Sequence, residues 1–194
     1  MDETARDRIL KAALALFAER GFEATRTSDI CARAAVSNGS LFHVFASKDA
    51  VAAALYRDGI AAYQAVLLAA LDGGAGTGRA LRAVVHAQCG WAEADQRARF
   101  LFTHGREIAA GEAARDIAAL NARFVAAIET WRAVPLHRPA LRPMPLPAFT
   151  AVLLGPSLMA IRGWLGMGGE APTTLAAIFA DAAAHSLLKD AEDA

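Results

Sequence analysis

Apolar residues recur along most of this chain at the spacing of one face of an α-helix. Between residues 4 and 20, Ile9, Ala13 and Leu16 share such a face, and Gly21 follows directly. A stripe of this kind predicts an amphipathic helix, and a glycine after its last turn is a common helix stop. The pattern therefore predicts a first helix over residues 4–20.

Similar stripes, separated by Gly- and Pro-containing breaks, continue to the end of the chain. They predict further helices over residues 27–34, 38–44, 48–71, 100–110, 113–134, 148–165 and 172–189, and one that begins at about residue 77 and carries Leu81, Val84, Val85 and Gln88 on one side. Residues 135–147 hold five of the seven prolines and are predicted to form a loop whose arginines, Arg138 and Arg142, are solvated. No segment alternates apolar and polar residues as a half-buried strand would. The sequence therefore predicts an all-α protein of about nine helices.

Residues 27–44 have the layout of a helix-turn-helix. Two short helices flank the turn, and Ile30 and Leu41 can lock them together while Ser37 offers an N-cap hydroxyl to the second helix. In such motifs the second helix presents its N-terminal side chains to the major groove of DNA. The layout is that of a three-helix DNA-binding domain at the N-terminal end of the chain, with a helix pair that never contacts DNA, as many all-α proteins contain, as the alternative.

The second of these helices offers side chains suited to that contact. Asn38, Ser40 and His43 are short or flat polar residues that can bond base edges or phosphates. Gly39 lets the backbone approach closely, and Lys48 can meet a phosphate together with the N–H groups at the start of its helix. We therefore interpret these residues as candidate DNA contacts.

Two segments resemble the TetR family of transcriptional regulators. They are residues 8–22 (RILKAALALFAERGF) and 29–49 (DICARAAVSNGSLFHVFASKD), within a likeness that covers roughly residues 6–56. The resemblance implies that the first motif helix also touches phosphate or a base edge through its opening residues. The predicted DNA-contacting set is then Thr27, Ser28, Asn38, Gly39, Ser40, Phe42, His43 and Lys48.

Three positions depart from the family's usual pattern. Ala35 stands where the family has glycine in the turn, so a positive φ there is either strained or avoided. Phe42 replaces a tyrosine whose hydroxyl usually meets phosphate, and Val44 replaces a common histidine while His43 sits one position earlier. The resemblance therefore implies fewer backbone contacts to DNA than the family usually makes.

The resemblance also implies a helical C-terminal body that binds a small ligand and dimerises. The candidate pocket residues are aromatic or polarizable and lie on the middle helices: His86, Cys89, Trp91, Phe102, His104, Phe124 and Trp131. For Phe124 and Trp131, which lie on an apolar stripe, packing in the core is the alternative. A metal site at His86, Cys89 and His104 would need folding to bring them together, because their spacing matches no metal motif. We predict no metal and no cofactor.

The last two predicted helices are rich in Ala, Leu and Gly and poor in charge. Leu175, Ile178, Phe179, Ala182 and Ser186 share one face of the last helix. Such surfaces suit an obligate homodimer interface, with a monomer core as the alternative. We favour the dimer because two-fold DNA sites need two DNA-binding heads.

Composition and charge exclude several classes of protein. Lys+Arg and Asp+Glu are both 20, so no global basic field draws the chain to nucleic acid, and any DNA contact must be local. Cys31 and Cys89 cannot build a disulfide framework, and the acidic N-terminus lacks the apolar core of a signal peptide. The uncharged stretch 143–161 contains four prolines, which argues against a membrane span. We expect a cytoplasmic protein without catalytic motifs, and not an enzyme.

The sequence thus predicts a DNA-binding domain over residues 1–47 and a ligand-sensing and dimerisation domain over residues 48–194. The predicted function is a homodimeric transcriptional regulator, most simply a repressor that a small molecule releases from its operator. The alternative is a helical small-molecule-binding or scaffold protein with weak or lost DNA binding, motivated by the neutral head and by Ala35, Phe42 and Val44.

Overall fold

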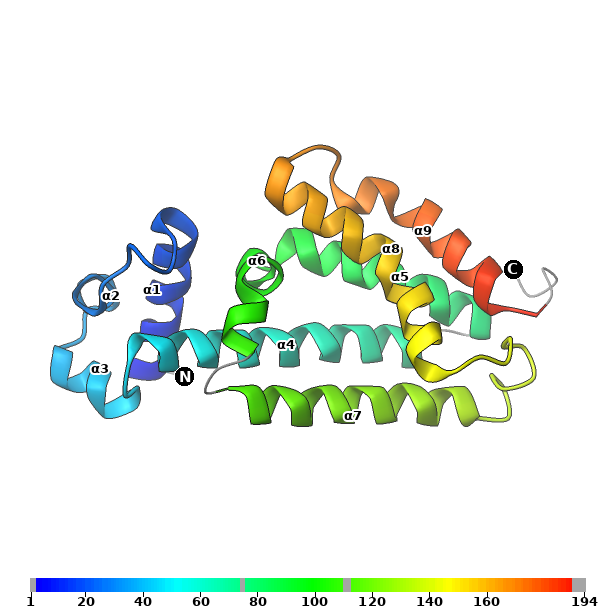
Figure 1. Cartoon of the computed structure of the whole chain (residues 1–194), viewed down its shortest axis with the longest axis horizontal. Helices are drawn as coiled ribbons and strands as arrows, with labels where there is room; N and C mark the ends of the chain where they lie inside the picture. The colour runs from blue at the N-terminus through cyan, green and yellow to red at the C-terminus, as the bar shows by residue number, and fades with distance from the viewer. Residues whose placement is uncertain (1–2, 74–75, 110–112, 190–194) are drawn as a thin grey trace. The chain divides into compact units, whose positions relative to one another are not determined.

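The computed structural model describes residues 3–73, 76–109 and 113–189, with side chains throughout except at residues 104–109. This part of the chain forms nine helices and contains no strand, which confirms the predicted all-α class (Figure 1). The helices are α1 (Ala5–Arg20), α2 (Thr27–Ala34), α3 (Asn38–Val44), α4 (Lys48–Asp72), α5 (Thr77–Ala94), α6 (Arg97–Ala109), α7 (Ala114–Ala133), α8 (Leu146–Met167) and α9 (Pro172–Leu187). The predicted end of α6 at residue 110 and the side chain of His104 lie outside the described residues.

The chain divides into two compact units. Unit 1 comprises Met1–Ile60 and Gln96–Ala119, and unit 2 comprises Ala61–Asp95 and Leu120–Ala194. The helices α4 and α7 therefore contribute residues to both units. The predicted boundary between the DNA-binding domain and the ligand-sensing domain, between residues 47 and 48, is not tested by this division and stays a prediction.

The core of unit 1 is organised around α1, which packs against α2, α3 and α6. Ile9, Ile30 and Leu41 are 0% exposed there, so each of the three N-terminal helices contributes a fully buried anchor. The ring of Phe17 stacks on Phe100 with centroids 5.6 Å apart. Burial of such side chains stabilises the motif helices, which are too short to be stable alone.

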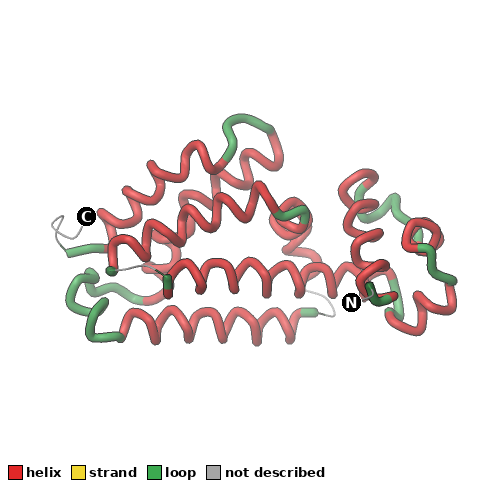
Figure 2. Tube along the Cα trace, turned by 180° about the vertical axis from the view of Figure 1, so that it is seen from behind, coloured by secondary structure: helices red, strands yellow, loops and turns green. Residues whose placement is uncertain are grey.

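The core of unit 2 lies among α5, α8 and α9, which pack on one another (Figure 2). The inner face of α9 carries small residues, with Ala176, Ala180 and Ala184 all buried. Small side chains let the axes of α9 and α5 come close together. Larger buried residues fill the rest of this core, among them Leu67, Leu81, Val85, Phe149, Leu153 and Leu187.

One helix among the described residues, α8, is long and apolar enough to cross a membrane by length and composition alone. It runs on through Pro156, as the predicted helix over residues 148–165 did, although the prolines of residues 143–161 argued against a membrane span. One of its faces is buried in unit 2 through Phe149, Leu153 and Ile161. We therefore interpret the rest of its apolar surface as a protein interface.

Candidate nucleic-acid interface

The turn between α2 and α3 adopts the conformation that its sequence disfavours. Ala35 has φ 51° and ψ 49°, in the left-handed region. Its N–H donates to the Ala32 carbonyl (3.4 Å), and the Val36 N–H donates to the Cys31 carbonyl (3.1 Å). This is the Schellman arrangement that closes a helix, usually with glycine at the left-handed position. Ala35 therefore adopts the positive φ, and its Cβ strains the backbone in this conformation.

We expect Ala35→Gly to stabilise the protein by about 1 kcal/mol, because glycine adopts this φ without a Cβ clash. The matched change Ala32→Gly, at an exposed helical position three residues earlier, should destabilise by about 1 kcal/mol. Chemical denaturation of both variants measures the two effects. Equal destabilisation by both would show that Ala35 carries no backbone strain.

The helix α3 presents its predicted contact residues to solvent. Ser37 caps it, because its Oγ accepts the Ser40 N–H at 3.0 Å. Leu41 is the buried anchor and is 0% exposed. The residues around this anchor are exposed: Asn38, Gly39, Ser40, Phe42 and His43. The helix thus holds one apolar side in unit 1 and offers a polar, uncharged side outward.

The start of α2 adds a second group of exposed residues. Thr27 is partly exposed and Ser28 is exposed in the first turn, where the helix N–H groups favour an anion. Asp29 caps this end by accepting the Arg26 N–H at 3.1 Å. Arg26 itself is exposed at this helix end, and sequence reasoning did not single it out. Its guanidinium makes it a further candidate phosphate contact.

The ammonium group of Lys48 is engaged within unit 1. It donates to the Phe22 carbonyl at 2.8 Å and to the Glu23 carbonyl at 3.5 Å. The same nitrogen lies 4.2 Å from the centre of the Phe22 ring. Because an ammonium has three protons, one remains for a phosphate. Lys48 therefore links α4 to the segment after α1 while keeping its charge at the start of α4.

Acidic residues take up much of the positive charge elsewhere in unit 1. Arg33 pairs with Glu19 at 2.7 Å, and Arg6 pairs with Asp58 at 2.7 Å. The segment 37–47, by contrast, contains no acidic residue. A phosphate backbone would therefore meet no local repulsion along α3, although few positive charges attract it there.

The candidate ligand residues do not gather at one place within a unit. Trp131 belongs to the core of unit 2, where its ring stacks on His137 with centroids 4.0 Å apart, and Phe124 is partly buried against that core. His86 is exposed on α5, and Phe102 belongs to unit 1. The side chain of His104 lies outside the described residues. The ligand-binding roles of these residues stay predictions.

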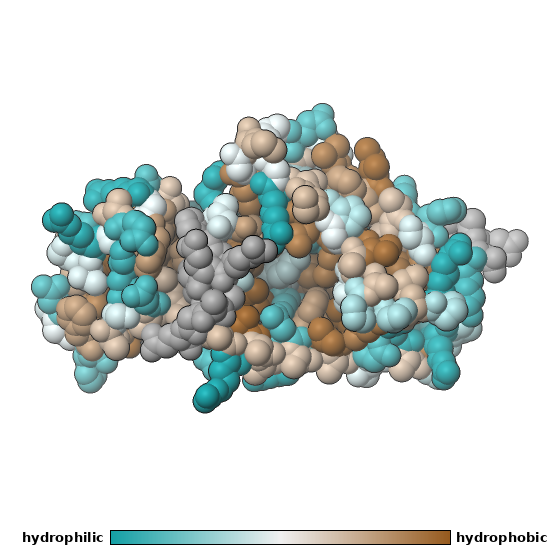
Figure 3. All heavy atoms as spheres, in the orientation of Figure 1, coloured by the Kyte–Doolittle hydropathy of each residue, from teal (hydrophilic) through white to brown (hydrophobic). Residues whose placement is uncertain are grey.

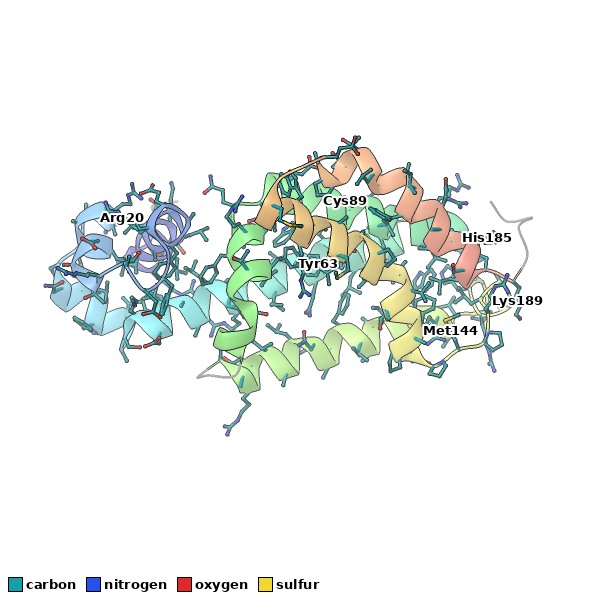
Figure 4. All side chains as sticks on the ribbon, turned by 45° about the horizontal axis from the view of Figure 1, so that its top comes forward. Arg20, Tyr63, Cys89, Met144, His185 and Lys189 are labelled. Atoms are coloured by element: carbon teal, nitrogen blue, oxygen red, sulfur yellow. The ribbon has the colours of Figure 1, made fainter. Side chains whose placement is uncertain are left out.

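Cys89 and Trp91 are buried on α5, and the Trp91 ring lies 5.1 Å from that of Tyr63 on α4 (Figure 4). Burial raises the pKa of the Cys89 thiol to about 11 and also raises the pKa of Tyr63. Both groups are therefore neutral near pH 7 and suit an apolar environment. Among the described residues no group of three His, Cys, Asp or Glu side chains could hold a metal ion.

Comparison with known proteins gives a family match at the N-terminal end. Residues 9–55 match the model of bacterial regulatory proteins of the tetR family. The HTH-type transcriptional repressor KstR2 of Mycolicibacterium smegmatis is 42% identical over 53 residues, which is 27% of this chain. That match spans only 26% of the length of the relative. The family match therefore covers α1 to α3 and the first part of α4.

The likeness in fold covers the whole chain. A tetR-family regulatory protein from Rhodococcus RHA1 superposes with a TM-score of 0.77 at 20% identity, over 97% of this chain and all of that one. The structure of superantigen PfiT also superposes with a TM-score of 0.77, at 23% identity and over 98% of this chain and all of that one. At such identities the likeness shows the fold and leaves the function to be argued from the residues.

Proposed function

We propose that this chain, whose residues 9–55 match the model of bacterial regulatory proteins of the tetR family, is a transcriptional regulator that binds operator DNA as a homodimer in the cytoplasm. In this role α3 enters the major groove and the start of α2 lies against the phosphate backbone. We infer that the chain represses transcription. A small molecule that binds the C-terminal domain, residues 48–194, relieves this repression.

The observation that carries this proposal is the orientation of α3. Its single buried anchor, Leu41, lies in unit 1, while Asn38, Ser40 and His43 are exposed. A short helix held in this way on two others can carry its polar residues to base edges without reorganising. The hydroxyl of Ser40 lies 2.9 Å from that of Ser37. Asn38 is therefore the stronger candidate for reading a base, since an amide can bond an adenine in two places.

A second copy of the chain is the partner that fits the outer surface of α8 and α9. Met159 on α8 is 67% exposed and Ile178 on α9 is 65% exposed. Open space surrounds Gly155 and Gly163 on α8, so a partner helix could approach the backbone closely. Figure 3 shows apolar residues gathered over these two helices. An apolar surface of this kind, poor in charge, is typical of homodimer interfaces.

An effector would act by shifting an equilibrium between two spacings of the DNA-binding heads in the dimer. A small molecule that binds one of these states more tightly shifts the population toward it and changes the DNA affinity by the same free energy. The predicted pocket residues Cys89 and Trp91, buried beside Tyr63, are candidates for its apolar contacts. An effector that binds tightly and leaves DNA affinity unchanged at saturation would contradict this part of the proposal.

Two substitutions test the assigned DNA contacts. Asn38→Ala should relax sequence preference at one position of the operator, with a loss of about 1–3 kcal/mol of discrimination. Lys48→Ala should instead weaken binding to all DNA sequences about equally and make the dependence on salt shallower. Fluorescence anisotropy with an operator and a scrambled duplex, at several salt concentrations, separates the two patterns.

Lys11→Ala is the matched control for Lys48→Ala, because Lys11 is an exposed lysine of α1 whose nearest carboxylate oxygen is 3.7 Å away. It removes the same charge from the same unit and should leave DNA affinity nearly unchanged. A thermal melt of Lys48→Ala accounts for the lost bonds to Phe22 and Glu23. Equal weakening by both lysine variants would leave Lys48 without a specific role.

A further inference from the structure

A cavity of about 830 Å³ lies in unit 2 beside the proline-rich loop after α7. Its lining brings together the end of α7, the loop and Lys189, two residues after the end of α9. Four basic residues and one acidic residue line it: Arg132, Arg138, Arg142, Lys189 and Glu129. In a chain without net charge, such a concentration of one sign around a single cavity creates a local positive potential that attracts anions.

Backbone bonds between segments far apart in the sequence hold the basic residues in place. The Arg142 N–H donates to the Leu187 carbonyl at 2.8 Å, and the Lys189 N–H donates to the Ala140 carbonyl at 2.9 Å. An antiparallel β-bridge joins Leu141 to Leu188 between them. The cavity wall is therefore a built part of unit 2, and Figure 4 shows Lys189 near Met144 at this end of the unit.

The loop is also fixed from its inner side. The ring of His137 stacks on Trp131, and its Nδ1 lies 3.1 Å from the Thr77 hydroxyl. Burial lowers the pKa of His137, so the ring is neutral near pH 7. It adds no charge to the cavity and serves as a packing residue beneath the loop.

The positive charges exceed what the neighbouring acid can neutralise. Glu129 pairs with Arg132, with an oxygen 2.9 Å from the guanidinium. Arg142 donates through its Nε to the Leu188 carbonyl, which is not charged. Among the described residues, no carboxylate forms an ion pair with Arg138, Arg142 or Lys189. Like charges held together by the fold repel one another, and an anion between them relieves that repulsion.

The rest of the lining is apolar. Met144 and Leu141 contribute, together with the three prolines at positions 135, 139 and 143. The volume lies within the range of sites for drug-sized molecules, which combine apolar walls with a few polar groups. A bare inorganic ion would leave most of this space and all of these walls unused.

We propose that this cavity binds a small organic anion that carries a phosphate or carboxylate group on an apolar body. The anionic group lies among Arg138, Arg142 and Lys189, and the apolar body lies against Met144 and the prolines. The proposal concerns binding at this cavity and does not depend on whether the chain binds DNA.

Isothermal titration of the full chain with three probes tests the proposal. The probes are 1-naphthyl phosphate, 1-naphthoate and inorganic phosphate. Binding of at least one naphthyl probe with a Kd below about 1 mM is expected at low salt, with one site per chain. Inorganic phosphate should bind more weakly than 1-naphthyl phosphate, because it cannot use the apolar walls. Whether 1-naphthyl phosphate or 1-naphthoate binds with the higher affinity distinguishes a phosphate site from a carboxylate site.

Two variants locate the binding. Arg138→Gln and Lys189→Gln each remove an exposed charge from the lining and should weaken the tighter naphthyl probe about 10-fold, since hydrogen bonds to charged groups are the strong ones. The matched control is Arg123→Gln, at an exposed arginine of α7 outside the cavity lining. It should bind like the parent chain. Thermal melts of the variants confirm that each is folded.

The sequence after Lys189 contains Asp190, Glu192 and Asp193, which lie outside the described residues. A triple variant, Asp190→Asn with Glu192→Gln and Asp193→Asn, should bind the naphthyl probes at least as tightly as the parent. No saturable binding by any probe in either the parent or this triple variant would overturn the proposal. An equal loss in Arg138→Gln, Lys189→Gln and Arg123→Gln would also overturn it, because the attraction would then be a general effect of charge.

Discussion

Replacing Leu41 by alanine is expected to destabilise the protein by about 2–5 kcal/mol, the usual cost of truncating a fully buried leucine. Leu41 is 0% exposed and is the only residue of α3 that is buried. Its loss leaves α3 without the contact that holds it on unit 1, so specific DNA binding should be abolished as well. Urea denaturation and fluorescence anisotropy with operator DNA measure the two effects.

Phe42→Ala is the control for this prediction. Phe42 is the next residue along α3 and is 52% exposed. Its truncation should change stability by no more than about 0.5 kcal/mol, as is usual at the surface, while it can still lower DNA affinity as a contact residue. If the two variants were equally stable, α3 would not be held by Leu41, and the proposed presentation of its polar face would be wrong.

Ile178→Asp is expected to convert the proposed homodimer into a monomer. A carboxylate at the centre of an apolar interface loses its hydration without gaining a partner, and the two copies of the substitution face one symmetric surface. DNA affinity should fall by about 10²–10⁴-fold, because a monomer loses the gain from binding two half-sites together. Sedimentation velocity gives the oligomeric state, and anisotropy gives the affinity.

Val125→Asp provides the matched control on α7, because Val125 is another exposed β-branched residue of unit 2, 42% exposed. It introduces the same charge outside α8 and α9 and should leave both the dimer and DNA binding unchanged. A folded Ile178→Asp that stays dimeric would remove the outer face of α9 from the interface.

Most of the helices could be predicted because their apolar stripes are local. The differences lie at helix ends: α6 begins at Arg97 rather than residue 100, and α8 begins at Leu146. The stripe of α6 becomes visible only at Phe100 and Leu101, which are buried, because its first turn carries two arginines. Periodicity marks where a helix meets the core and not where its backbone bonds begin.

Within the candidate site, the exposure of Asn38, Ser40 and His43 could be predicted from the sequence, because Leu41 is the apolar residue placed to anchor α3 and these polar residues flank it. The bonds of Lys48 to Phe22 and Glu23 did not, since they join residues 25 and 26 positions apart. The basic cavity of unit 2 could not be predicted from the sequence either, because it depends on the bridge from Leu141 to Leu188, which joins two segments far apart in the chain. Arg142 is exposed, as expected, and the structure adds a bond from its Nε to the Leu188 carbonyl that the sequence did not predict.

The measurement that tests the account most directly is selection of bound fragments from a genomic DNA pool by the purified full chain, at about 150 mM salt. Recovery of an inverted-repeat site is expected, because a two-fold dimer presents two copies of α3 to two half-sites. Asn38→Ala, run in parallel, should recover the same repeat with one position relaxed. A folded, dimeric chain that recovers no sequence would contradict the proposed function.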